Sequence, residues 1–375
     1  MLLKEGRQMI QIKQTKTQLL FFIIQTQIGV GILSLPYSVF QRAKQDGWMS
    51  ILLAGLVVQL LILLFWMLAK RFPELSYFRY LKLILGTYIG NVVTIAYTIY
   101  GVLVSALILM FSTKVIKTWL LIYTPKWIVM SLLVLTAIML AREHVLTISN
   151  IYILVSGLVL FLLFMSLVVL GTYPVEIRYL FPIGKEFGMN MISGAEEAGF
   201  SMFGFEMLLL LFPYFNTLGE KSILKTVSLA SWLVTLLYLT MFLICAVVFS
   251  PSELLIIPQP VLYFVKSINL QIIERIDLIF LSLWIVNVIT SLTSYLFFSL
   301  EGTRNLLKGM NKKKVTWCLM GFGSVSFSIA LMVDITKIEV YHFYVMNLSY
   351  MMVVILPIII LILSLILKRK GVNSG

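Results

Sequence analysis

The chain has 375 residues, of which 60% are hydrophobic and only 12% are charged, and its mean hydropathy is +1.01. These values exclude an ordinary water-soluble domain and indicate an integral membrane protein. The net charge of +13 calls for no nucleic-acid partner, because the basic residues gather in short segments between apolar runs, where they set membrane orientation.

The first 18 residues are polar and basic. They carry Lys4, Arg7, Lys13 and Lys16, and they lead into an apolar run that holds polar residues from Gln25 onward. That run is too long for a secretory signal and has no small-residue cleavage site. We therefore predict a cytoplasmic tail rather than a signal peptide.

Ten apolar runs follow, each near the 20 residues that a helix needs to cross about 30 Å of hydrocarbon. The predicted spans are 19–40, 48–69, 86–111, 119–141, 146–171, 195–213, 226–249, 276–298, 317–333 and 343–367. No segment alternates in polarity as the strands of a membrane barrel do, so the predicted fold is all-α. The spans fill the chain, which predicts a single transmembrane domain over residues 1–375.

The basic residues are unevenly divided between the two sides of these spans. With the tail inside, 19 of the 29 Lys and Arg fall on the inner side and 10 on the outer side. This excess predicts that both termini are cytoplasmic. Basic loops of this kind also favour contact with anionic lipid.

Span 1 contains the run TQIGVGILSLPY, in which Gly29, Gly31 and Pro36 interrupt an apolar helix. Freed backbone groups in hydrocarbon cost several kcal/mol each unless a cavity, a neighbour or a ligand satisfies them. We predict that span 1 is broken to form a ligand site. Close helix packing at the glycines and a plain proline kink are the alternatives.

Span 6 repeats this pattern with Gly199, Gly204 and Pro213 in the run GFSMFGFEMLLLLFPYF. The two interruptions correspond if residues 19–171 and 195–367 are pseudo-repeats of inverted orientation. Paired broken helices of this kind indicate a binding site near the membrane midplane, where helix amino ends receive an anionic group such as a carboxylate.

Glu206 lies within span 6, where a carboxylate costs roughly 2.5–3.5 kcal/mol on insertion scales. We predict that it faces the cavity, where it pairs with a ligand ammonium group or carries a proton. The alternative is a buried hydrogen bond to a tyrosine or to span 1. Glu196 and Glu197 are closer to the outer end of the span and are predicted to be mainly solvated.

Polar side chains on spans 3 and 8 are candidates to complete the cavity: Tyr97, Tyr100, Asn287, Thr290, Ser291, Thr293 and Ser294. Thr290 and Ser294 are four residues apart on one helix face, and Asn287 precedes Thr290 by three. A polar stripe on span 8 is thus predicted, although single Ser and Thr residues often bond their own helix. A sodium ion between span 1 carbonyls and span 8 hydroxyls stays an open alternative.

The sequence contains no motif typical of a zinc site, a haem site or a phosphate-binding loop. His144, His342, Cys245 and Cys318 are far apart, without zinc or haem spacing, and both cysteines are predicted to be reduced and packed. The glycines of span 1 lack the Lys-Ser/Thr pair of a phosphate-binding loop. We predict no enzyme activity, no metal and no cofactor.

The chain resembles the amino acid, polyamine and organocation transporter superfamily and, more narrowly, the B subunit of endospore germinant receptors. The resemblance covers nearly the whole chain. It is carried by QIGVGILSLP in span 1, DGWMSILLAG at the start of span 2, RFPELSYFRYLKLILGTYIG before span 3, and RYLFPIGKEFGMNMISGAEEAGFSMFGFEMLLLLFPYF through span 6.

This resemblance implies a LeuT-like fold with two inverted five-helix repeats. It also implies that Gly29 and Gly31 line an amino acid carboxylate site, and that Phe203, Gly204 and Glu206 form the facing wall. Span 5 has no lysine of the kind that some proton-coupled transporters of the superfamily place there, which puts such coupling in doubt.

Two functions are consistent with the resemblance. The first is a nutrient sensor in the spore inner membrane that binds a small germinant and signals through a larger A subunit and a C lipoprotein. L-alanine-like amino acids are the leading germinants, with sugars or co-germinants that act through partner receptors as the alternative. The second is a proton- or sodium-coupled amino acid transporter. Similar bundles serve both functions, so the fold alone does not separate them.

Overall fold

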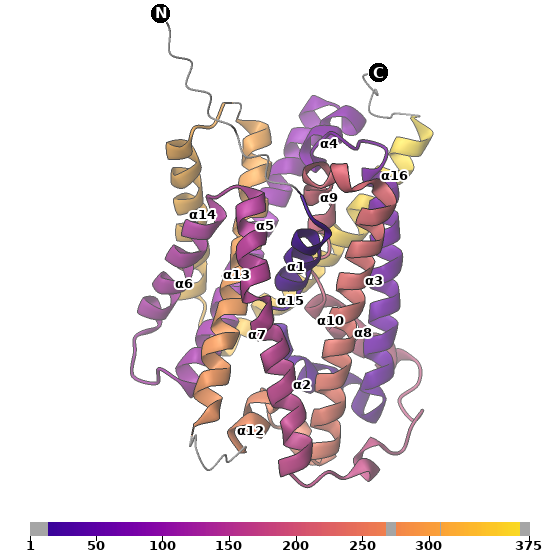
Figure 1. The fold of residues 1–375 in the computed structure, drawn as a ribbon, viewed down its shortest axis with the longest axis vertical. Coiled ribbons are helices and arrows are strands. Elements are labelled where there is room, and N and C mark those ends of the chain that lie inside the picture. Colours follow the sequence, from indigo (N-terminus) through magenta and orange to yellow (C-terminus); the bar gives the residue numbers. More distant parts are fainter. Residues whose placement is uncertain (1–13, 268–274, 308, 368–375) are drawn as a thin grey trace, which may run out of the picture.

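The computed structural model describes residues 14–267, 275–307 and 309–367, and all regular secondary structure in these ranges is helical (Figure 1). The α-helices are α1 (Lys16–Gln27), α2 (Gly31–Ala43), α3 (Gly47–Ala69), α4 (Tyr77–Leu85), α5 (Thr87–Trp119), α6 (Lys126–Ala141), α7 (Val145–Thr172), α8 (Met189–Ser201), α9 (Met207–Leu211), α10 (Glu220–Val248), α11 (Pro251–Leu254), α12 (Pro260–Ser267), α13 (Ile276–Leu306), α14 (Lys312–Met332), α15 (Ile338–Ser349) and α16 (Leu356–Ile366). A π-helix, η6 (Tyr350–Ile355), joins α15 to α16. Short 3-10 turns are η1 (Lys44–Asp46), η2 (Ile177–Leu180), η3 (Phe212–Tyr214), η4 (Asn216–Leu218) and η5 (Ile335–Lys337).

The described part of the chain contains seven helical stretches that are long and apolar enough to cross a membrane. They are Gly31–Ala69, Thr87–Trp119, Val145–Thr172, Glu220–Val248, Ile276–Leu306, Lys312–Met332 and Ile335–Ile366. The all-helical membrane protein predicted from the sequence is therefore confirmed. The number of ten crossings and the inverted repeat stay predictions.

Both predicted helix interruptions are present. Within span 1, α1 ends at Gln27 and α2 begins at Gly31; within span 6, α8 ends at Ser201 and α9 begins at Met207. Gly29 and Gly204 lie in the two interruptions and marked them correctly. The predicted interruption at Pro36 is wrong, because Pro36 lies inside α2, and Pro213 lies in η3 after α9.

The predicted start of span 4 at residue 119 is wrong. Helix α5 continues to Trp119, and α6 begins only at Lys126. Pro125 precedes α6 as its N-cap, because proline fits the start of a helix and cannot continue a preceding one. Residue 119 is therefore the last residue of α5, whereas the apolar run had predicted it as the first residue of span 4.

Helix α1 lies in the middle of the bundle, where it packs against α7, α10 and α13 (Figure 1). Helix α13 packs closely along α5, and α2 packs against α8. Helices α6 and α14 pack on α5 from outside. The central position of α1 explains why its polar residues, including Gln25 and Gln27, are buried despite the cost of desolvating their amides.

Single cysteines placed at the two ends of the bundle test the charge-based orientation. We expect a cysteine at Lys313 to react only with a permeant reagent in intact cells, and cysteines at Lys185 and Lys337 to react with an impermeant one. All three positions are exposed, and the background would carry Cys245→Ala and Cys318→Ala. Labelling of position 313 by the impermeant reagent would overturn the orientation.

Candidate functional site

The interruption between α1 and α2 exposes backbone carbonyls that a continuous helix would have paired. The Ser291 hydroxyl of α13 lies within hydrogen-bond distance of three of these carbonyls. Its Oγ is 3.1 Å from the Gln25 carbonyl oxygen and 3.3 Å from those of Thr26 and Ile28. The Tyr238 hydroxyl of α10 donates to the carbonyl of Gln27 over 2.9 Å. Side chains from two neighbouring helices thus take over the role of the missing helical bonds.

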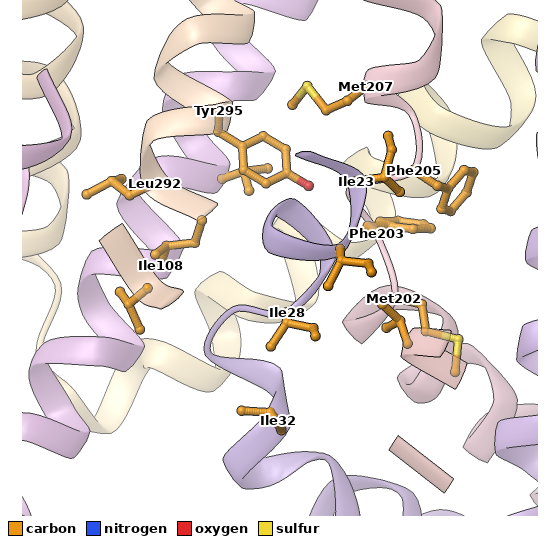
Figure 2. Packing of buried hydrophobic residues seen from close by; sticks show 14 of the residues in the cluster. Ile23, Ile28, Ile32, Ile108, Met202, Phe203, Phe205, Met207, Leu292 and Tyr295 are labelled. Atoms are coloured by element: carbon orange, nitrogen blue, oxygen red, sulfur yellow. The ribbon is translucent and has the colours of Figure 1, made fainter. Parts of the chain in front are cut away.

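The second interruption, between α8 and α9, lies directly against the first. Gly204 has a φ of 124°, and a Cβ at this position would come within 2.8 Å of the Gln27 backbone nitrogen. The side-chain amide of Gln27 donates to the carbonyl of Met202 over 2.6 Å. Figure 2 shows Ile28 on the segment between α1 and α2, and Met202 and Phe203 on the segment between α8 and α9.

Glu206 follows this turn and is 4% exposed. Its Oε2 accepts a hydrogen bond from the Gly204 N–H over 2.6 Å, and its Oε1 accepts one from the Tyr295 hydroxyl over 2.9 Å. Figure 2 shows the Tyr295 hydroxyl directed toward the two interruptions. The hydrogen bond to a tyrosine, considered above as an alternative for Glu206, is therefore present, and it offsets part of the cost of burying a carboxyl group.

A cavity of about 580 Å³ opens beside the interruptions. Its inner part is lined by backbone or side chains of Thr26, Gln27, Gly29, Val30, Gly31, Tyr100, Ile108, Ser201, Phe203, Ser291, Tyr295 and Ser349. Its outer part reaches Gln41 and Arg42 at the end of α2, about 16 Å from Gly31 at a rise of roughly 1.5 Å per residue.

Charged groups line only the outer part of this cavity, and they lie in pairs. Arg42 and Glu197 approach to 3.4 Å, and Lys114 and Glu339 to 3.9 Å. Around the interruptions the lining is made of neutral hydroxyl, amide, aromatic and aliphatic groups. The inner part therefore suits a ligand without net charge, whose own charged groups, if present, must be met by backbone and amide dipoles.

The start of α2 is the strongest anion-binding feature of the inner part. Val30 is the N-cap and provides no side-chain cap, so the first-turn N–H groups depend on other partners. Gly29 and Gly31 line the cavity beside it without side chains. This arrangement can accept a carboxylate, because the positive end of the helix dipole and free amides meet there.

Seven of the eight predicted site residues divide into three groups. Gly29, Gly31 and Phe203 line the cavity. Gly204 and Glu206 lie at the turn behind it, and Thr290 and Ser294 lie on the α13 face that binds α1. Thr290 donates to the side-chain oxygen of Gln25 over 2.9 Å, and the hydroxyls of Ser294 and Thr26 are 2.8 Å apart. Thr290 and Ser294 thus bond the interrupted helix and do not line the cavity, whereas Ser291 does both.

Tyr97 lies apart from the other predicted residues. Its hydroxyl is 2.6 Å from that of Tyr77 in α4 and donates to the carbonyl of Met352 in the π-helix over 2.7 Å. Tyr100, one helical turn later, lines the cavity instead. The two tyrosines lie on neighbouring turns of α5 and both contact the Phe298 ring, so they differ in their position along the helix.

The prediction that Glu197 is mainly solvated is wrong. Its side chain is 13% exposed, lines the cavity and pairs with Arg42, because α8 packs against α2 over this length. Glu196 is exposed, as predicted. The acidic pair of span 6 therefore has one member in solvent and one at the cavity.

The sequence analysis did not single out Gln27 as a site residue. It lines the cavity and is 2% exposed, and its Oε1 has no hydrogen-bond partner in the described ranges, while its Nε2 is engaged by Met202. A buried acceptor without a partner is costly, and a ligand donor would relieve that cost. The sequence signal that could have identified Gln27 is the polar run Gln25, Thr26 and Gln27 inside an otherwise apolar span.

Side chains that could bind a metal ion together are not grouped in the described residues. No cluster of three or more His, Cys, Asp and Glu side chains suited to a metal ion occurs in the residues that the structure describes.

A family model described as spore germination protein matches residues 13–372. Spore germination protein B2 of Bacillus subtilis (strain 168) is 23% identical over 369 residues, covering 96% of this chain and 97% of the relative. Spore germination protein YndE of the same organism is 22% identical over 324 residues, covering 85% and 87%. Spore germination protein GerQB of Bacillus cereus is 25% identical over 308 residues, covering 80% and 82%.

Gly204→Ala tests the contact between the two interruptions. We expect it to lower the free energy of unfolding by about 1–3 kcal/mol, because a side chain is strained at this φ and would overlap the Gln27 backbone. Thermal unfolding of the purified protein in detergent measures the change. Gly157→Ala in α7 is the control, since a Cβ there meets no atom within 4 Å. Equal melting temperatures for both variants would show that the contact does not stabilise the fold.

Proposed function

The chain belongs to the spore germination protein family, and from this membership we propose that it is the nutrient-binding subunit of a germinant receptor. The observation that carries the proposal is that two interrupted helices meet at the wall of one cavity of about 580 Å³. A structural subunit would gain nothing from interruptions that cost several kcal/mol per unpaired group. A binding subunit gains polar backbone at its ligand.

We propose an amino acid as the ligand. Its carboxylate would bind the amino end of α2 at Gly29 and Gly31, and its ammonium group would donate to the unpaired Oε1 of Gln27. Its side chain would contact Phe203 and Ile108. The absence of a charged group among the inner lining residues that the structure describes favours a neutral amino acid, since a charged side chain there would be desolvated without a partner.

The membrane arrangement belongs to the same proposal. Ten crossings would form two inverted repeats over residues 19–171 and 195–367, with both termini cytoplasmic and the protein in the spore inner membrane. The matching order of the two interruptions supports the repeat, and the distribution of Lys and Arg supports the orientation. The cavity mouth near Arg42 would then face outward, where germinants arrive.

Binding would be signalled through other subunits, a larger A subunit and a C lipoprotein. A binding protein can transmit a signal only if the ligand prefers one of two conformations that a partner distinguishes. A ligand that contacts both interruptions meets this requirement, because Gly31 and Phe203 belong to helices that are each divided at the site.

Coupled amino acid transport is the second candidate. The observation that favours it is the meeting of α1 carbonyls with the hydroxyls of Thr290 and Ser291, a set of oxygens that a sodium ion would also accept. In a proton-coupled transporter, the buried Glu206 would be the candidate proton carrier. The family membership favours the sensor.

Gly31→Leu tests the binding site. We expect the variant to be inserted normally but to give no germination response to amino acids, because the added side chain would meet Ser201 and occupy the inner cavity. The loss of the rapid fall in optical density of spores measures the response. Gly157→Leu, at an open position of α7, should respond like wild type. A normal response in Gly31→Leu spores would remove the cavity from the proposal.

Reconstitution separates the sensor from the transporter. Purified alone in liposomes, the protein should bind a labelled amino acid but show no concentrative uptake under an imposed proton or sodium gradient. Deleting either partner gene should abolish the response of spores. Accumulation of the labelled amino acid by the lone protein, with partner deletion leaving germination intact, would establish the transporter instead.

A further inference from the structure

We propose that a groove between the starts of α1 and α10 binds the phosphate of an anionic phospholipid headgroup. The groove has a volume of about 370 Å³. It is lined by Lys16, Lys221, Ser222, Lys225, Thr226 and Leu229. It shares no lining residue with the cavity described above, and the inference is independent of what that cavity binds.

The groove concentrates positive charge without compensation. Lys221 and Lys225 are four residues apart and share one face of α10, and Lys16 faces them from the first turn of α1. Within the described ranges, none of the three lysines has a carboxylate within 4.0 Å. Like charges held in one groove repel one another, so an anion bound between them would stabilise the arrangement. The nearest acidic residue in sequence, Glu220, is exposed.

A hydroxyl in the same groove also lacks a partner. Ser222 Oγ is a buried atom without a hydrogen-bond partner among the described residues, whereas the Thr226 hydroxyl donates to the carbonyl of Ser222 over 2.8 Å. A buried hydroxyl without a partner costs free energy, and a phosphate oxygen would accept a hydrogen bond from it. Three ammonium groups and a free hydroxyl are the donors that a phosphate group requires.

The surface beyond the groove identifies the anion as part of a lipid. Leu229, Leu233 and Leu236 continue along α10 from Lys225 at helical spacing, and about half of each side chain is exposed. In a membrane this row faces acyl chains, so a headgroup in the groove would leave its tails on the leucines. Basic pockets between membrane helices on the cytoplasmic side bind anionic headgroups in the same manner. A free phosphate ion would use the lysines but not the leucine row.

A lipid in this groove would join α1 to α10. Lys16 begins the half-helix that ends at the first interruption, and Lys221 and Lys225 begin the helix whose Tyr238 binds the carbonyl of Gln27. The headgroup would therefore fix the N-terminal end of a half-helix that is held at its other end by Tyr238 and Ser291.

Titration of a fluorescent phosphatidylglycerol into the full chain in neutral detergent tests the site. We expect tighter binding of phosphatidylglycerol than of labelled phosphatidylcholine. Each Lys→Gln change in the groove should weaken it about fivefold, and the triple variant K16Q/K221Q/K225Q on the order of 100-fold. S222A, which leaves the charge unchanged, should weaken binding several-fold. The matched control K312Q/K313Q/K314Q removes the same charge from the exposed start of α14 and should bind like wild type.

Three results would overturn the proposal. Equal losses in both triple variants would show that total charge, and not the groove, attracts the lipid. Equal binding of phosphatidylcholine by wild type would exclude recognition of an anionic headgroup. Competition by inorganic phosphate as effective as that by unlabelled phosphatidylglycerol would make the ligand a free anion.

Discussion

The fold depends on a constraint of the hydrocarbon interior, where every backbone carbonyl and amide must find a partner within the protein. Interrupting α1 releases carbonyls at residues 25–28, and α13 and α10 supply hydroxyls to meet them. Because the single Ser291 hydroxyl lies within hydrogen-bond distance of three carbonyl oxygens, α13 must pack directly against the interruption at this residue. The position of α1 between α7, α10 and α13 follows from this requirement.

The same constraint shapes the electrostatics of the cavity. Charged side chains are costly away from water, and the lining keeps them at the outer end, where Arg42 pairs with Glu197 and Lys114 with Glu339. Polarity near the interruptions comes from dipoles of the backbone, of hydroxyls and of the Gln27 amide. Dipoles fixed by the fold can meet the charged ends of a small ligand without leaving an unpaired charge when the cavity is empty.

The sequence predicted what local chemistry determines. Glycines located both interruptions, and the composition identified an all-helical membrane protein, because these signals act within a few residues. The partners could not be predicted in the same way. The hydrogen bond between Glu206 and Tyr295 joins residues 89 positions apart. Tyr97 and Tyr100 lie one turn apart on α5, yet only Tyr100 lines the cavity. Motifs identified the family, which the matched family model confirms, although they did not reveal the role of Gln27.

Both interruptions are held by one helix, and this has a consequence for any ligand in the cavity. On α13, Ser291 binds the carbonyls beside Gly29, and Tyr295, one turn further, binds Glu206 after Gly204. A shift of either half-helix must therefore break or remake bonds to the same two turns of α13, so the two interruptions cannot move independently at low cost. A ligand that contacts Gly31 and Phe203 adds a second link between them on the cavity side. Such a ligand would stabilise one relative position of the two half-helices. Binding can be sensed only if this relative position differs between two conformations of the protein.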